Sequence, residues 1–158
     1  SLATRQFDAA LPVQCGPYAV KYAVFPAQTA ASGEVAGKTT DYLSDDLKDR
    51  LAKGSLTFDL AVQFFCDEAS TPIEDASVLW SEEKSPYVKV ARLHLPQQDL
   101  RAGEGLQLQQ RVESLSFDPW HALVEHRPLG EIMRARNVAY RVSTQTRQAA
   151  PEPTGDEK

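Results

Sequence analysis

The 158 residues of this chain suffice for one domain with a single hydrophobic core. Apolar residues make up 42% and charged residues 25%, which is ordinary for a soluble globular protein. The net charge of −5 argues against a general affinity for nucleic acid or anionic membranes. No apolar run approaches the ~20 residues that span a bilayer, and no signal peptide opens the sequence.

The two cysteines, Cys15 and Cys66, lie far apart and lack the spacing of metal ligands. Each lies in or beside an apolar segment, so we expect two reduced, buried thiols and a cytoplasmic, reducing environment. The three histidines complete no zinc pattern with these cysteines. The sequence opens with Ser1 and its only methionine is Met133, so we expect either a trimmed initiator methionine or an upstream segment that was cut away.

The first part of the chain predicts one strand and one helix. Residues 1–16 show little periodicity, whereas residues 18–25 alternate as a strand does and end at a proline. Residues 27–38 are small and polar, which predicts a loop. Apolar positions spaced by four predict a helix over residues 40–53, capped by Thr40 and ended by a glycine.

The middle of the chain holds the clearest strand, residues 56–65, in which apolar and polar residues alternate. Residues 67–86 predict a loop, and a short apolar piece at 78–80 is a candidate for a further strand. Residues 87–95 predict a third long strand. Its alternation changes register, which indicates a β-bulge near Ala91.

Residues 97–110 show no regular pattern, and the charged, proline-containing residues 150–158 predict a disordered tail after a domain over residues 1–149. The half-polar strands favour antiparallel pairing. So few strands leave an open sheet with two exposed edges, because closing a barrel takes about eight. We therefore expect this chain to be part of a larger structure.

The most informative stretch is residues 127–140, which predicts a helix with a proline in its first turn. At helical spacing, one side of this helix carries Leu129, Ile132, Met133, Arg136 and Tyr140. The last two are four residues apart, so their side chains lie one above the other. Both can lay their apolar parts along the core and place their polar ends in water. Alternatively, the fixed positive charge favours the anionic form of the phenol.

The sequence resembles the catalase-like haem proteins, and in particular their small catalase-related branch. The similar segments are residues 18–22, the stretch from Pro72 to Ala91, and most specifically residues 115–130 continuing through Arg134-Ala135-Arg136 to Tyr140. The resemblance implies an α+β fold, the C-terminal half of a catalase-like antiparallel β-barrel with a proximal helix that carries the haem ligand.

In catalases an Arg-x-x-x-Tyr pair lies on this helix, and the tyrosine is the axial ligand of the haem iron. Residues 136–140 match that pattern. The resemblance therefore implies haem b as cofactor, Tyr140 as the ligand of the metal, and Arg136 as the residue that keeps the phenol deprotonated.

Other residues near this pair are candidates for contact with the haem. Met133 and Ile132 would pack near the porphyrin. Arg127, with His126, would approach a haem propionate, because a bidentate donor suits a carboxylate. Simple exposed charges are the alternative interpretation of Arg127 and His126.

The distal histidine that handles the peroxide in this family lies in the N-terminal half of the domain, to which nothing here corresponds. His94 and His121 match no distal motif and are interpreted as structural. We therefore assign no catalytic residue to this chain. We expect a companion chain to supply the distal half, in a hetero- or homo-oligomer.

The resemblance thus predicts a haem-binding subunit of a catalase-related enzyme that acts on hydrogen peroxide or organic hydroperoxides. The alternative is a non-catalytic accessory subunit of the same fold that stabilises another enzyme. A haem-free, lipocalin-like binder is a third interpretation of the strands, but it leaves Arg136 and Tyr140 unexplained.

Overall fold

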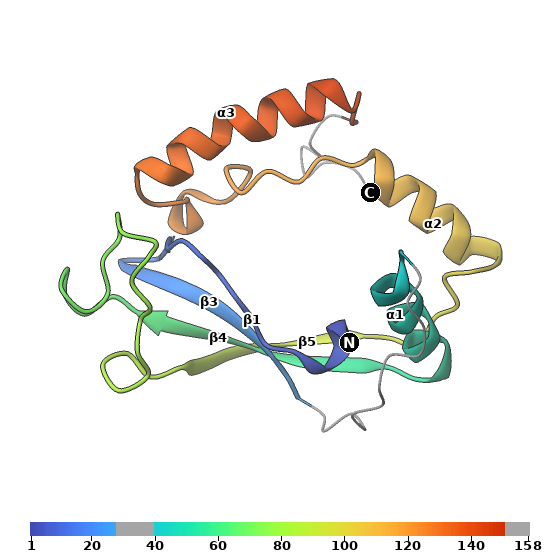
Figure 1. The fold of residues 1–158 in the computed structure, drawn as a ribbon, viewed down its shortest axis with the longest axis horizontal. Coiled ribbons are helices and arrows are strands. Elements are labelled where there is room, and N and C mark those ends of the chain that lie inside the picture. Colours follow the sequence, from blue (N-terminus) through green and yellow to red (C-terminus); the bar gives the residue numbers. More distant parts are fainter. Residues whose placement is uncertain (28–39, 151–158) are drawn as a thin grey trace. The chain divides into compact units, whose positions relative to one another are not determined.

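The computed structural model describes residues 1–27 and 40–150. The elements follow in the order η1 (Leu2–Thr4), β1 (Phe7–Asp8), β2 (Val13–Cys15), β3 (Tyr18–Pro26), α1 (Tyr42–Lys53), β4 (Leu56–Phe64), β5 (Val88–Leu95), α2 (Gly103–Ser114), η2 (Val124–His126) and α3 (Glu131–Thr146) (Figure 1). None of the helices in these ranges has the length and apolarity that crossing a membrane requires.

The strands form a mixed-length sheet in the order β1-β3-β4-β5, with β2 also paired to β3. Both β1 and β2 pair antiparallel with β3, and β4 pairs antiparallel with β5. The register shifts between Leu60 and Ala61, opposite Ala91 and Lys89, so the bulge predicted near Ala91 is confirmed. Within the described residues the sheet does not close into a barrel, and the predicted barrel is therefore not confirmed.

Several predicted elements are confirmed, although they differ in burial, since β4 is largely buried and β5 is almost entirely exposed. The three long predicted strands correspond to β3, β4 and β5, and the predicted first helix corresponds to α1. The predicted cap of this helix was wrong, since its N-cap is Asp41, which makes no side-chain capping hydrogen bond. Most of the predicted loop at 27–38 and most of the predicted tail lie outside the described residues.

Three other expectations were wrong. Residues 97–110 do not remain irregular, since most of them belong to α2, and the apolar piece at 78–80 forms no strand. No residue of α2 is buried, so its leucines follow no core-facing stripe that periodicity could detect. Both cysteines are free, but Cys66 is exposed and Cys15 half-buried, rather than both being buried.

The chain divides into two compact units, which are described separately. Unit 1 comprises Ser1–Asp8, Tyr22–Val62 and Val88–Gln109, and unit 2 comprises Ala9–Lys21, Gln63–Tyr87 and Gln110–Lys158.

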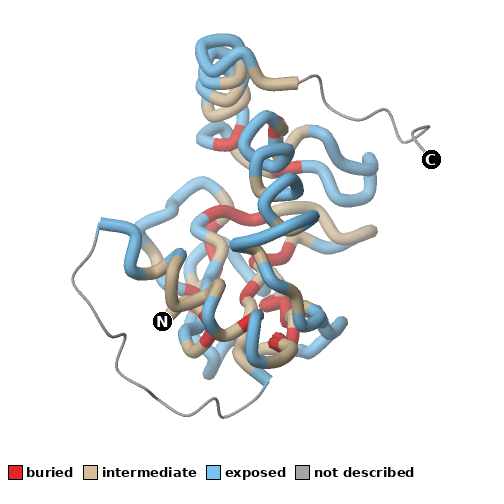
Figure 2. The backbone as a smooth tube through the Cα atoms, turned by 90° about the vertical axis from the view of Figure 1, so that its right-hand side faces the viewer, coloured by how far each residue is buried: buried red, intermediate tan, exposed pale blue. Residues whose placement is uncertain are grey.

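The core of unit 1 lies where η1 and α1 meet the strands. Its buried cluster consists of Ala3, Leu51, Leu56 and Phe58. Figure 2 colours the buried parts of the chain red. The residues of the cluster come from η1, α1 and β4, so the apolar side of each element is turned to the same cluster. Around the cluster pack partly buried side chains, namely Val24, Leu47, Leu95 and Leu100.

Unit 1 also buries a carboxylate on β4. The side chain of Asp59 is 8% exposed and accepts from Lys89 Nζ at 2.5 Å and from Arg92 Nε at 3.0 Å. These hydrogen bonds, first from Lys89 and then from Arg92, lower the pKa of the Asp59 carboxyl from its ordinary value.

The lowered pKa of Asp59 predicts a loss of stability in acid. A carboxylate with a depressed folded pKa stabilises the fold above its unfolded pKa of about 4, and this contribution disappears as the pH falls through the folded pKa. We therefore expect Asp59→Asn to be less stable than wild type at pH 7 and to lose less stability below about pH 4. Urea unfolding at a series of pH values measures this, with Asp41→Asn on the exposed start of α1 as control. Parallel pH curves for Asp59→Asn and wild type would contradict it.

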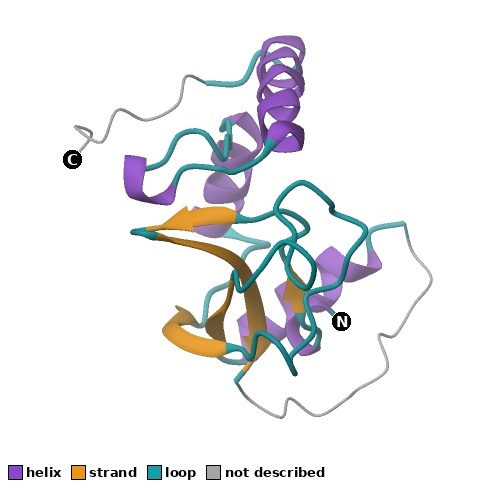
Figure 3. Cartoon of the chain, turned by 90° about the vertical axis from the view of Figure 1, so that its left-hand side faces the viewer, coloured by secondary structure: helices purple, strands orange, loops and turns teal. Residues whose placement is uncertain are grey.

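Unit 2 contains the long segment between β4 and β5, which forms neither helix nor strand (Figure 3). Buried polar groups order this segment instead. Gln63 Nε2 donates to the carbonyl oxygens of Trp80 and Ser85 at 2.9 and 2.8 Å. Trp80, only 2% exposed, donates from Nε1 to Pro72 O at 3.2 Å. Lys21 Nζ lies 4.9 Å from the centre of the Trp80 ring, and burial lowers the pKa of this amine.

Candidate functional site

The helix that carries the predicted arginine–tyrosine pair begins later than predicted. Its first residue is Glu131, not a residue near 127, and Pro128 forms an isolated antiparallel bridge with Val13. Leu129 N donates to Pro12 O at 3.2 Å, so this residue is not on the helix either. The predicted first-turn proline and the predicted start of the apolar stripe were therefore wrong.

The reason is a short ladder between β2 and the segment before α3. Gln14 N donates to Arg127 O at 2.8 Å, and Gly16 N donates to Glu125 O at 3.0 Å. Because its backbone pairs with β2 and the residue that follows it, this segment forms only the short 3₁₀ helix η2, and the α-helix begins after it. The chain turns into α3 only at Gly130, whose φ of 87° suits a residue without a Cβ atom.

A tryptophan holds the first turns of α3. Trp120 Nε1 donates to Met133 O at 2.9 Å, and Asp118 Oδ1 accepts from Trp120 N at 2.9 Å. Met133 is 4% exposed, whereas its neighbour Ile132 is 42% exposed. Within this chain the two predicted porphyrin neighbours therefore differ, since Met133 is enclosed and Ile132 is exposed.

Arg136 and Tyr140 are in direct contact, as their spacing predicts. Arg136 Nη2 donates to Tyr140 Oη at 2.6 Å, and its guanidinium carbon lies 5.3 Å from the centre of the Tyr140 ring. On its other side, Arg136 Nη1 lies 3.8 Å from Met133 Sδ. Both Arg136 and Tyr140 are half-buried. The polar ends of the pair are thus bonded to each other.

This arrangement suits a phenol oxygen that binds a metal. A guanidinium stays positively charged at any physiological pH, and here it places that charge and an N–H donor directly beside the phenol oxygen. A phenolate is a ligand of ferric haem in the catalase type of site. Among the described residues, no three His, Cys, Asp or Glu side chains gather as a metal-binding group. A tyrosine oxygen can serve as the single protein ligand of a metal that a cofactor holds.

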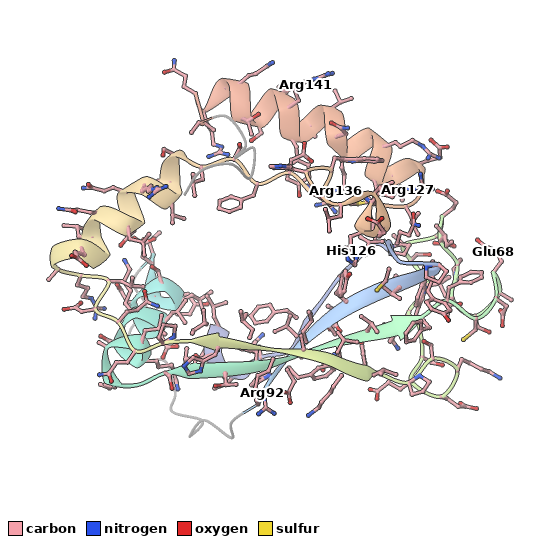
Figure 4. All side chains as sticks on the ribbon, turned by 180° about the vertical axis from the view of Figure 1, so that it is seen from behind. Glu68, Arg92, His126, Arg127, Arg136 and Arg141 are labelled. Atoms are coloured by element: carbon pink, nitrogen blue, oxygen red, sulfur yellow. The ribbon has the colours of Figure 1, made fainter. Side chains whose placement is uncertain are left out.

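Arg127 and His126 lie close to this part of α3. Figure 4 shows both of them and Arg136 towards the N-terminal half of the helix, whereas Arg141 points to its opposite side. Arg127 is exposed, and within the described ranges its guanidinium forms no hydrogen bond or ion pair. It is therefore available to a carboxylate, which is what a haem propionate would require.

The predicted structural histidine of β5 has a structural partner, since His94 Nδ1 lies 3.4 Å from Thr57 Oγ1. Sequence reasoning did not identify Trp120 as a support of α3. The signal that was available is the indole N–H, which needs an acceptor when a tryptophan is not fully exposed. The sequence alone does not identify the carbonyl oxygen that accepts this hydrogen bond.

Comparison with known proteins gives a fold but no sequence relative. No family model matches the chain, and the search of curated proteins gave no match. Among solved structures, the chain is similar to a fungal catalase at 18% identity, a bacterial catalase at 20% and catalase A from Saccharomyces cerevisiae at 13%, each with a TM-score of 0.72. Each match covers 93% of this chain but only 31 to 32% of the catalase chain. The chain therefore has the fold of a fragment of a catalase.

Proposed function

We propose that this chain is the proximal part of a catalase-like haem protein, in which Tyr140 is the ligand of the haem iron. The observation that carries the proposal is the 2.6 Å hydrogen bond from Arg136 Nη2 to Tyr140 Oη on α3. It occurs within a catalase-like fold, which the two residues alone would not indicate.

The residues of this chain have defined tasks in such a site. Haem b, when bound, supplies an iron that can cleave the O–O bond of hydrogen peroxide or an organic hydroperoxide. Arg136 orients the phenol oxygen of Tyr140 through its hydrogen bond and places a positive charge beside it. Trp120 and Met133 fix the turn of α3 that precedes Arg136. Arg127 offers its guanidinium to a propionate.

A complete site needs a companion. The matched catalases are far longer than this chain, which covers 31 to 32% of them. We propose that the companion, as a further segment or a separate chain, supplies the acid–base group that handles the hydroperoxide.

The spectrum of the assembled protein tests this proposal. The chain is produced together with its proposed companion, and the purified assembly is supplied with haem. We expect a Soret band with the features of a high-spin ferric, tyrosinate-ligated haem. Tyr140→Phe removes the donor oxygen and should abolish these features.

The matched control is Tyr18→Phe. Tyr18 is 59% exposed, and its ring packs edge-on against Phe64 at 5.4 Å, a contact that phenylalanine keeps. This variant should retain the spectrum of the wild type. A wild-type assembly that forms but stays colourless with haem would overturn the proposal and support the accessory role.

A further inference from the structure

The N-terminus of α3 is capped by a residue far away in the sequence. Glu74 Oε2 accepts from Glu131 N at 2.8 Å, across 57 positions of the chain. The residue at the N-cap position itself is Gly130, which has no side chain to accept this hydrogen bond. Glu74 therefore takes over the capping role that a serine or aspartate next to the helix usually fills.

The charges around this contact support it. A carboxylate is favourable at the positive end of a helix dipole. Arg134, one turn into α3, pairs with Glu131, and its Nε lies 3.0 Å from Glu131 Oε2. The pKa of Arg134 is raised mainly by Glu131, and the charge of Glu74 adds to this. One cation thus compensates the two carboxylates at the start of the helix.

The lack of a side chain at Gly130 leaves room for the same contact. A Cβ atom at this position would lie 3.1 Å from Glu74 Oε2, which is closer than ordinary van der Waals contact. The φ of 87° is also one that side chains with a Cβ atom rarely adopt. Both features allow the Glu74 carboxylate to lie directly against the backbone where α3 begins.

The direction of α3 decides where Tyr140 is presented. Tyr140 lies nine positions after Glu131, which corresponds to about 13 Å along a helix. A tilt of about 10° at the first residue would therefore move the Tyr140 end by about 2 Å. Functional sites tolerate displacements of only about 0.5 Å. A small tilt of α3 at Glu131 therefore moves the Tyr140 phenol by more than a functional site tolerates.

We propose that Glu74 is a positioning residue for Tyr140, because its carboxylate fixes the start and the direction of α3. This inference rests on the proposed function, because only a bound haem makes the position of Tyr140 important. The direction of α3 itself can be measured without haem. Glu74 contacts neither the phenol nor the guanidinium of the pair and acts through the helix.

The first test uses the complete chain without haem. Residual dipolar couplings give the direction of α3 relative to β2, both of which belong to unit 2. Glu74→Ala should change this direction and raise the amide exchange of Glu131 about fivefold. Glu74→Gln keeps an acceptor oxygen and should restore most of the wild-type direction. Glu68→Gln, an exposed change in the same segment, should alter neither quantity.

The second test uses the haem-loaded assembly, in which the rhombic splitting of the ferric electron paramagnetic resonance signal reports the iron–tyrosine geometry. We expect it to change in Glu74→Ala and to recover in Glu74→Gln. An unchanged direction of α3 in Glu74→Ala would overturn the inference. The inference would also be overturned if Glu74→Ala altered the amide exchange of Glu131 but left the electron paramagnetic resonance signal unchanged. Glu74 would then only stabilise the helix. A wild type that lacks any iron–tyrosine signal, while its α3 still depends on Glu74, would overturn the proposed function alone.

Discussion

Replacement of Arg136 by glutamine is expected to lower the affinity of the assembled protein for haem by roughly 10- to 100-fold. The change leaves Tyr140 in place but removes the cation and the N–H group that donates to Tyr140 Oη at 2.6 Å. Without them the phenol oxygen loses the hydrogen bond and the charge that hold it in place as a ligand of the iron. The rate of haem transfer to an excess of a haem-free globin measures the effect.

The matched control is Arg141→Gln on the same helix. Arg141 is exposed and points to the side of α3 opposite Arg136 (Figure 4), so its loss should leave haem transfer unchanged. Arg136→Lys keeps the charge without the planar fork and should fall between wild type and Arg136→Gln. Equal losses in Arg136→Gln and Arg141→Gln would show that the total charge of the helix matters rather than this hydrogen bond.

Replacement of Trp80 by alanine is expected to lower the free energy of unfolding by about 3–5 kcal/mol. The indole is 2% exposed, donates to Pro72 O and lies against the Lys21 ammonium. Its removal leaves a large cavity and takes the aromatic face away from a cation whose pKa is already lowered by burial. Denaturant unfolding of the purified chain measures the change.

The neighbouring residue provides the control for Trp80. Leu79 is 86% exposed, and Leu79→Ala should stay within about 0.5 kcal/mol of wild type. A similar loss in the two variants would mean that the segment between β4 and β5 responds to any change, and that burial of the indole is not the cause.

The strands were predictable because apolar and polar residues alternate along them, as in β4, where Phe58 is in the core and the adjacent Asp59 pairs with two cations. The helix α2 was not predictable from periodicity, because none of its residues is buried. Its composition of glutamine, glutamate, leucine and arginine supports a helix through intrinsic propensity instead.

The contact within the candidate site was predictable because it is local. Arg136 and Tyr140 are four residues apart on one helix, and that spacing brings them together regardless of the surroundings. The start of α3 was not predictable, because it depends on the ladder with β2 and on the carboxylate of Glu74. Such contacts join segments that are distant in the sequence, and no local pattern specifies them.

The buried thioether beside Arg136 makes the candidate site sensitive to oxidants. Met133 is the only methionine of the chain, is 4% exposed, and has its sulfur 3.8 Å from Arg136 Nη1. Oxidation to the sulfoxide would place a polar oxygen next to Nη1 of the guanidinium, where a new hydrogen bond would shift the group whose Nη2 donates to the phenol. In mass spectrometry, the addition of one oxygen to the peptide that contains Met133 would therefore identify the molecules in which an oxidant has reached the buried side of α3.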